Sequence, residues 1–204
     1  MKFFRFWTLV ASVCASNLFL SDVHAGSIVL GETKSLSSPA VVTQTSLEFF
    51  LDRTGADDGT PLSVGNYQLR VALTGPGAGS SVRILGAAAT TSHTQAFALD
   101  TTSITGGTSA YANTLNLASP FDIADGAGLL KLNLELQPGA VGTYALTVQT
   151  GSGNTEFTSP VDFSTLLSVA ADSGSLNVAV PEPSSIALVG VLMASVFPRR
   201  RVAI

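Results

Sequence analysis

The sequence predicts an all-β fold, a two-sheet antiparallel sandwich, from three observations. Apolar and polar residues alternate without a break at 130–136, and again at 67–73 and 144–150. This period of two is typical of strands with one buried and one solvated face. Glycine and proline end these runs, as at 75–77 and 138–139. Helical spacing is absent outside the two terminal segments. Strands at this density predict two packed sheets.

The first expected strand lies at 41–52, with Leu47, Phe49 and Leu51 on one side. Tyr67–Leu73 follows, and a strand beginning at 82–85 comes after the Gly-Pro-Gly turn. A last strand, 176–180, leads into the C-terminal segment.

The alternating runs at 130–136 and 144–150 are expected to pair as a hairpin with a longer loop. Two polar stretches of small residues, Ala87–Gln95 and Asp100–Asn113, are expected to be long loops. Loops of that length are either functional or mobile.

The N-terminal residues 1–25 are typical of a secretory signal peptide, here expected as a helix. Lys2 and Arg5 precede an apolar run at 6–20, and small residues at Val23 and Ala25 predict cleavage after Ala25. An uncleaved anchor is the alternative, but the run is shorter than the ~20 residues that span a bilayer. Lipidation at Cys14 is disfavoured because this cysteine lies within the apolar run.

The C-terminal residues 181–204 contain three parts in a fixed order. Pro181, Glu182 and Pro183 come first, an apolar stretch at 186–197 follows, and Arg199, Arg200 and Arg201 end it. Prolines favour an extended segment, the apolar stretch favours a transmembrane helix, and arginines stay on the cytoplasmic side. As a helix, 184–198 would cover ~22 Å of a ~30 Å hydrocarbon core, which favours a temporary anchor.

This order of parts resembles the PEP-CTERM family of sorting tails. The resemblance implies recognition by an exosortase, cleavage near Pro181-Glu182-Pro183 and a setting among bacteria that produce exopolysaccharide. The alternative is a plain C-terminal membrane anchor.

Between these segments, residues 26–180 are expected to form one β-sandwich domain. This stretch has five basic and twelve acidic residues, a net charge of −7. Nucleic acid is excluded as a partner because phosphate binding needs clustered Lys and Arg. The only cysteine is Cys14, so the mature domain would have no disulfide, thiolate metal site or cysteine nucleophile.

Three segments of this domain resemble cohesin-like domains. They are an Asp-Gly turn before a strand at 125–136, a Gly-x-Tyr at 142–146, and an early strand at 65–71. The resemblance implies a jelly-roll sandwich that binds a protein such as a dockerin, and related domains bind carbohydrate. The chain departs from the pattern because no Tyr-Asp-Pro follows Leu73.

Catalytic chemistry finds little support in the sequence, and we expect no enzyme and no cofactor. His93 lacks a nucleophile motif or a metal-ligand partner, so a solvated loop histidine is expected. The carboxylates Asp57 and Asp58 lie in a sequence typical of an Asp/Gly turn. Asp122 and Asp125 are weak calcium candidates, with an ordinary turn as the alternative.

The aromatic residues indicate few sugar-stacking positions. Tyr67 and Tyr144 alternate in phase with core residues and are expected to be buried. Tyr111 is expected in a loop, where it either stacks on a ligand or packs on the sandwich edge.

Two functional hypotheses follow. The first is an exported, exosortase-sorted protein of the cell surface or extracellular matrix with a non-enzymatic domain. The second is a cohesin-like module that binds a surface protein or exopolysaccharide. Both need a signal peptidase and place the chain outside the inner membrane, transiently anchored in it. A binding module should also expose an apolar or aromatic patch on one sheet face.

Overall fold

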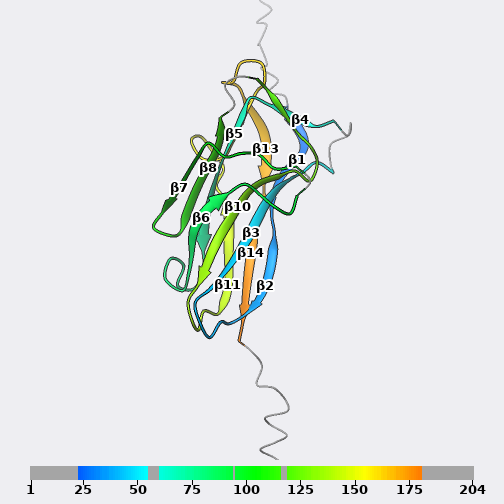
Figure 1. The fold of residues 1–204 in the computed structure, drawn as a ribbon. Helices are drawn as coiled ribbons and strands as arrows, with labels where there is room; N and C mark the ends of the chain where they lie inside the picture. Colours follow the sequence, from blue (N-terminus) through cyan, green and yellow to red (C-terminus); the bar gives the residue numbers. More distant parts are fainter. Residues whose placement is uncertain (1–22, 55–59, 94, 116–118, 181–204) are drawn as a thin grey trace, which may run out of the picture.

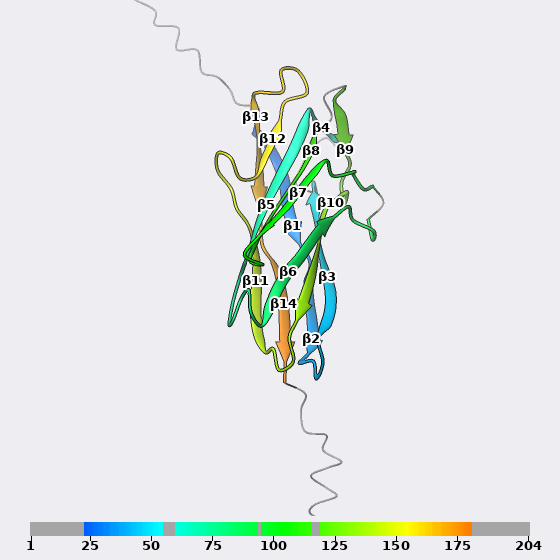
Figure 2. The same cartoon turned by 60° about the vertical axis from the view of Figure 1, so that its left-hand side comes forward.

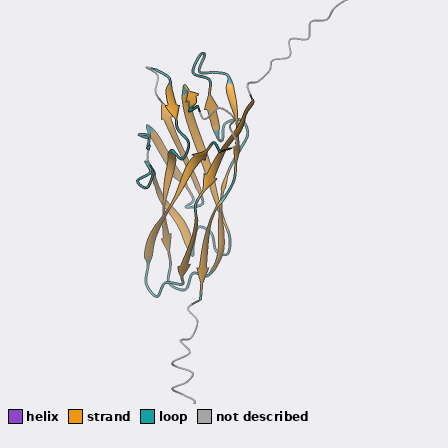
Figure 3. Cartoon of the chain, turned by 90° about the vertical axis from the view of Figure 1, so that its right-hand side faces the viewer, coloured by secondary structure: helices purple, strands orange, loops and turns teal. Residues whose placement is uncertain are grey.

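The computed structural model describes residues 23–54, 60–93, 95–115 and 119–180, and every regular element in them is a strand. These strands form an elongated two-layer sandwich (Figures 1 and 3). The predicted signal helix, except Val23–Ala25 at the start of β1, lies outside the described residues, and so do the predicted transmembrane helix, the Pro-Glu-Pro motif and the arginine cluster. Within the described residues, no helix is long and apolar enough to cross a membrane.

The first sheet contains four strands with antiparallel neighbours, in the order β1-β3-β10-β6. Their bounds are β1 Val23–Gly31, β3 Thr43–Asp52, β10 Gly128–Leu136 and β6 Val82–Ala88. Their inward residues are large and apolar: Leu47 and Phe49 on β3 and Leu132 on β10 are fully buried. The predicted strands at 41–52, 82–85 and 130–136 are therefore confirmed.

The second sheet runs β2-β14-β11-β5-β8-β7, and β12 and β13 extend it beside β5. Its long strands include three predicted from sequence: β5 Asn66–Thr74, β11 Gly142–Val148 and β14 Gly174–Ala179. The others are β2 Thr33–Ser37, β7 Thr101–Thr105, β8 Ser109–Leu115, β12 Glu156–Thr158 and β13 Leu166–Ala171.

Two strand pairs are parallel, so the sandwich is not wholly antiparallel as expected. β1 pairs with β13, and β2 pairs with β14. The reason is that β1–β2 and β13–β14 both run the length of the sandwich in one direction. β1–β2 changes sheet at Glu32, and the β1–β13 pairing joins the two layers along one side (Figure 2).

The predicted hairpin between 130–136 and 144–150 is wrong. β10 pairs with β3 and β6, whereas β11 pairs with β14 and β5 in the other sheet. The link at 137–141 crosses between layers, where the Gly139 N–H donates to the Pro39 carbonyl at 3.0 Å. Alternation identifies a half-buried strand but not its neighbour, and both strands bury their apolar side against one core.

The predicted loop Asp100–Asn113 is also wrong, because it contains β7 and β8 as a hairpin. Gly106 and Gly107 form its turn with φ of 60° and 69°, a conformation glycine adopts without strain. Only small residues of β8 face the core, with Ala110 and Ala112 fully buried. A strand without large apolar residues lacks the alternation signal. The other predicted loop, Ala87–Gln95, is largely confirmed, since β6 ends at Ala88.

An aromatic cluster fills the end of the core near the start of β5. Tyr67 is fully buried and contacts the rings of Phe97, Phe121 and Phe157 at centroid distances of 5.9, 6.3 and 5.6 Å. A small sheet of β4 Leu62–Val64 and β9 Phe121–Ile123 closes this end. The Tyr67 hydroxyl donates to the Leu129 carbonyl at 2.8 Å, and burial raises its pKa. The predicted burial of Tyr67 and Tyr144 is confirmed.

Candidate functional site

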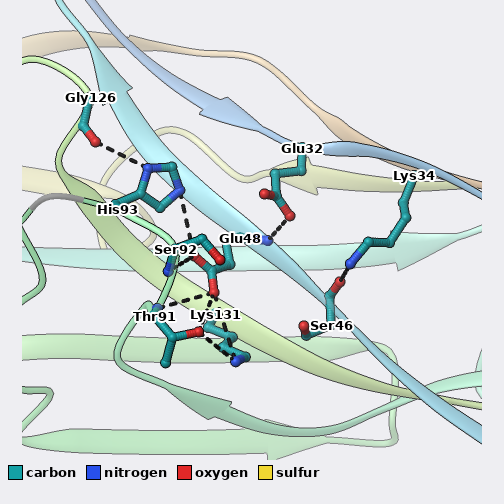
Figure 4. A network of polar contacts seen from close by, with 9 residues as sticks. All are labelled: Glu32, Lys34, Ser46, Glu48, Thr91, Ser92, His93, Gly126 and Lys131. Atoms are coloured by element: carbon teal, nitrogen blue, oxygen red, sulfur yellow. Dashed lines mark hydrogen bonds and ion pairs between the residues drawn. The ribbon is translucent and has the colours of Figure 1, made fainter.

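The most connected polar group on the first sheet is the carboxylate of Glu48. Its side chain points outward from β3, but only 2% of the residue is exposed. The segment 90–93, which follows β6, folds back over this face and covers it (Figure 4). Glu48 occupies an outward position in the alternating pattern of β3, which would leave its side chain in water. The 90–93 segment is what buries it.

The covering segment donates hydrogen bonds to both carboxylate oxygens of Glu48. The Thr91 N–H and hydroxyl donate to Oε1 at 3.1 Å each, and the Ser92 N–H donates to Oε2 at 3.2 Å. Lys131 Nζ lies 3.8 Å from Oε1 and donates to the Thr91 hydroxyl at 2.9 Å. A loop of polar residues is thereby fixed to the sheet by one acid.

The pKa of Glu48 reflects two opposed effects. Burial raises it, but the hydrogen bonds from Thr91 and Ser92 and the nearby His93 outweigh burial and lower it. The carboxylate is therefore ionised at neutral pH and fully occupied as an acceptor. A group held in this way is a poor general base, and its geometry indicates a structural clamp.

His93 is not the solvated loop residue that the sequence predicted. Its side chain is 16% exposed, and its ring packs against that of Phe50, with the ring centres 5.1 Å apart and the planes tilted by 30°. Nδ1 lies 3.1 Å from the Gly126 carbonyl, and Nε2 lies 3.5 Å from Glu48 Oε2. The sequence offered no signal for these contacts, which depend on a loop returning across the sheet.

A second polar feature lies where β1 ends. The Glu32 carboxylate accepts the Glu48 N–H at 3.0 Å, and Lys34 Nζ donates to the Ser46 carbonyl at 2.7 Å. Here β1–β2 leaves the first sheet for the second, so these two side chains replace main-chain partners on the β3 edge. They blunt an otherwise open edge.

The calcium candidates Asp122 and Asp125 have separate roles. Asp125 Oδ1 accepts the Arg53 N–H at 2.7 Å and joins the turn before β10 to the end of β3. Asp122 lies on β9 opposite Ser63, and its carbonyl accepts from Gln95 at 2.9 Å. No group of three or more potential metal ligands occurs in the described part of the chain. Asp57 and Asp58 lie outside it.

The outer face of the second sheet carries a connected group of Tyr, Arg, Gln and Glu side chains. We call Gln68, Arg70, Tyr111 and Glu156 the sheet-two platform. The Tyr111 hydroxyl donates to Gln68 Oε1 at 2.9 Å, and Gln68 Nε2 donates to Glu156 Oε2 at 2.9 Å. The Arg70 guanidinium lies 5.6 Å from the centre of the Tyr111 ring. Tyr111 is thus on β8, opposite Arg70, and not in a loop as expected.

The 159–165 loop between β12 and β13 lies at the end of the sandwich where β5 begins, next to Gly65. Val161 is 88% exposed, and Phe163 and Leu166 are also exposed. Hydrogen bonds from Thr165 and the Ser164 N–H hold the Asp162 carboxylate and lower its pKa. Phe163 has a φ of 57°, a left-handed conformation that is uncommon for a side chain of this size. Apolar side chains are therefore exposed at this end of the sandwich.

No protein-family model matches the chain, and neither does any curated protein. Solved cohesin structures do resemble it. A CaCohA2–CaDoc0917 complex, whose CaCohA2 module is from Clostridium acetobutylicum, is 16% identical, with a TM-score of 0.55 over 75% of this chain and 99% of that one. The seventh ScaB type I cohesin of Pseudobacteroides cellulosolvens is 11% identical, with a TM-score of 0.53 over 78% and 95%.

A third structure contains the sixth cohesin of Acetivibrio cellulolyticus scaffoldin B in complex with a mutant Cel5 dockerin. It is 11% identical, with a TM-score of 0.52 over 75% of this chain and 99% of that one. The match spans nearly the whole of each cohesin and the sandwich of this chain. The described domain therefore has a cohesin-like fold.

Proposed function

We propose that the domain is a non-catalytic binding module for a protein partner. The observation that carries this proposal is the sheet-two platform on a cohesin-like sandwich. The solved complex of a cohesin of this fold with a Cel5 dockerin supports protein binding as the use of such a module. Tyr and Arg are the residues most enriched at the centres of protein interfaces.

The platform suits a protein better than a polysaccharide. Sugar rings stack on a free aromatic face, but Arg70 lies over the ring of Tyr111 at 5.6 Å. The hydroxyl and amide groups that link Tyr111, Gln68 and Glu156 offer fixed donors and acceptors instead.

The alternative is a matrix protein without a specific partner. One observation favours it: the exposed large apolar residues lie mainly at the two ends of the sandwich, and not on a sheet face as expected for a binding module. Both functions share the proposed route, in which the chain is exported, cleaved after Ala25 and sorted through Pro181-Glu182-Pro183. Ala25 lies in β1, so cleavage there would leave the strand to begin at Gly26.

Affinity capture from an envelope extract of the host tests the binding proposal. We expect the immobilised protein to retain a discrete protein, and Arg70→Ala combined with Tyr111→Ala to reduce its retention at least about tenfold. Asn133→Ala, on the outer face of β10, is the matched control and should leave retention unchanged. Circular dichroism of each variant confirms folding.

Equal retention by all three proteins would contradict the proposal. Retention of a polysaccharide in place of a protein would favour the carbohydrate alternative. The sorting route has its own test, the intact mass of protein from the host. A species spanning Gly26 to about Pro183 in the released fraction is expected, and membrane protein that still contains Arg199–Arg201 as its only form would contradict it.

A further inference from the structure

One end of the sandwich, where β14 finishes, contains no charged residue. We call it the charge-free end and define it by residues 36–45, 74–82, 136–145 and 176–180, all of which are described and uncharged. These segments form the turns and strand ends at the bottom of Figure 1. The whole domain has twelve acidic and five basic residues, so an uncharged end is a marked asymmetry.

The same end exposes aliphatic side chains from three segments. Val41 is 69% and Val180 66% exposed, and Val42 and Val141 are exposed as well. Hydrogen bonds bring these segments together: the Gly139 N–H donates to the Pro39 carbonyl at 3.0 Å, and the Ser38 N–H to the Ala179 carbonyl at 2.7 Å. The valines therefore belong to one surface.

The opposite end is acidic. Asp52 and Asp125 lie where β3 ends and before β10 begins, and Asp162 lies in the loop between β12 and β13. An anionic lipid surface would repel that end and not the charge-free one. The domain is thus polarised along its long axis.

The chain leaves the sandwich from the charge-free end. Pro181–Ser185 separate Val180 from the apolar stretch at 186–197. Five residues reach at most about 18 Å when fully extended. If the apolar stretch enters a bilayer, the charge-free end is held within that distance of its surface.

We propose that the charge-free end is a membrane-contacting surface, which seats Val41, Val42, Val141 and Val180 in the interfacial layer of the bilayer that holds the tail. This contact adds buried apolar area to a short anchor, and it points the acidic end and the 159–165 loop away from the membrane. The proposal does not depend on the protein-binding function, because it uses a different surface.

Depth measurements on the chain from Gly26 to Ile204, without the apolar N-terminal run, in phosphatidylcholine vesicles test the contact. This form has no native thiol, and single cysteines at Val41, Asp162 or Ala194 carry an environment-sensitive fluorophore. Lipids with a nitroxide on the acyl chain quench only labels that reach the bilayer. We expect quenching at positions 41 and 194 and none at 162.

Quenching at 194 without quenching at 41 would overturn the proposal, because the tail would be inserted and the end would still be in water. Absence of quenching at 194 would overturn the proposal too, because it would show that the tail does not enter the bilayer. A change at 41 that occurs without lipid and grows with protein concentration would indicate contact between copies and would also contradict it.

Binding strength provides a second measurement. Val41→Asp combined with Val42→Asp should lower the vesicle partition coefficient of the chain from Gly26 to Ile204 at least about tenfold, since two exposed valines lose their burial and two charges are added. Val161→Asp combined with Leu166→Asp, which adds the same two charges at exposed positions of the other end, is the control and should change it less than about twofold. Equal effects would show that only net charge matters and would refute the contact.

Discussion

Replacing Glu48 by glutamine is a sharp test of the clamp that covers the first sheet. The residue is 2% exposed, and its carboxylate accepts hydrogen bonds from the Thr91 N–H and hydroxyl and from the Ser92 N–H. Glutamine has nearly the same shape, but its amide nitrogen is a donor and cannot accept these bonds. Lys131, 3.8 Å away, also loses its negative partner.

The expected loss is about 2–4 kcal/mol in the free energy of unfolding. A hydrogen bond to a charged group contributes roughly 1.5–3 kcal/mol, and an unpaired buried donor costs roughly 1–3 kcal/mol. Removing one partner of a buried ion pair costs up to about 5 kcal/mol. Partial exposure of Thr91 and Lys131 to water reduces the total. For a domain of this size, the melting temperature should fall by roughly 4–16 °C.

Urea unfolding followed by circular dichroism measures this loss, with the m-value as a check that both states are unchanged. Asp100→Asn is the control, because this carboxylate is exposed and accepts a hydrogen bond from the neighbouring Thr101 hydroxyl at 3.3 Å. Its loss should be below about 1 kcal/mol. A Glu48→Gln protein within 0.5 kcal/mol of the wild type, on the order of measurement error, would refute the clamp.

The remaining predictions concern pH, packing and a buried hydroxyl. The pKa of Glu48 in the folded protein lies below its ordinary value of 4.5. The ionised carboxylate therefore stabilises the fold above pH 4.5, and this stabilisation is lost as the pH falls through the lowered pKa. The difference in unfolding free energy between the wild type and Glu48→Gln should shrink in unfolding curves taken below pH 4.5. Gly31→Ala should lower the free energy of unfolding by about 3 kcal/mol or more, since a Cβ would lie 2.3 Å from the backbone nitrogen of Gly174. Gly86→Ala is the control, because the nearest atom to its added Cβ is 3.9 Å away. It should change the free energy of unfolding by less than about 1 kcal/mol in the same urea assay. Tyr67→Phe should cost about 1–2 kcal/mol, because it leaves the Leu129 carbonyl without its 2.8 Å donor; a loss near zero in urea unfolding would show that this bond contributes nothing.

Strands with large apolar residues on one side could be predicted from the sequence. Leu130–Leu136 alternates strictly, and its inward leucines are buried as expected. The segments that resembled cohesin-like domains lie in and around β5, β10 and β11, and the solved structures support the same fold.

Strand neighbours and polar strands could not be predicted. β10 and β11 follow one another but lie in opposite sheets, because alternation reports burial and carries no information about pairing. β7 contains Thr and Ser with one isoleucine and lies at an edge, so its sequence is that of a loop. Its partner β8 buries alanines, which give little hydrophobic contrast.

The candidate sites depended on tertiary contacts that no local pattern shows. Glu48 is buried by a loop about forty residues away, with Thr91 at a separation of 43. Arg70 and Tyr111 lie close together because β5 and β8 are neighbours. This pairing could not be predicted, because β8 belongs to the β7–β8 hairpin that was expected to be a loop. The environment of His93 could not be predicted for the same reason, since its partners Phe50 and Gly126 come from two other segments.

Site-specific photo-crosslinking in the host tests the central claim, that this domain binds a protein through the sheet-two platform, most directly. A benzoylphenylalanine in place of Tyr111 keeps an aromatic side chain on β8, and the same group in place of Asn133 labels the outer face of the first sheet. The account predicts a discrete protein adduct from position 111 and none from position 133. Absence of an adduct at 111, or the same adducts from both positions, would contradict it.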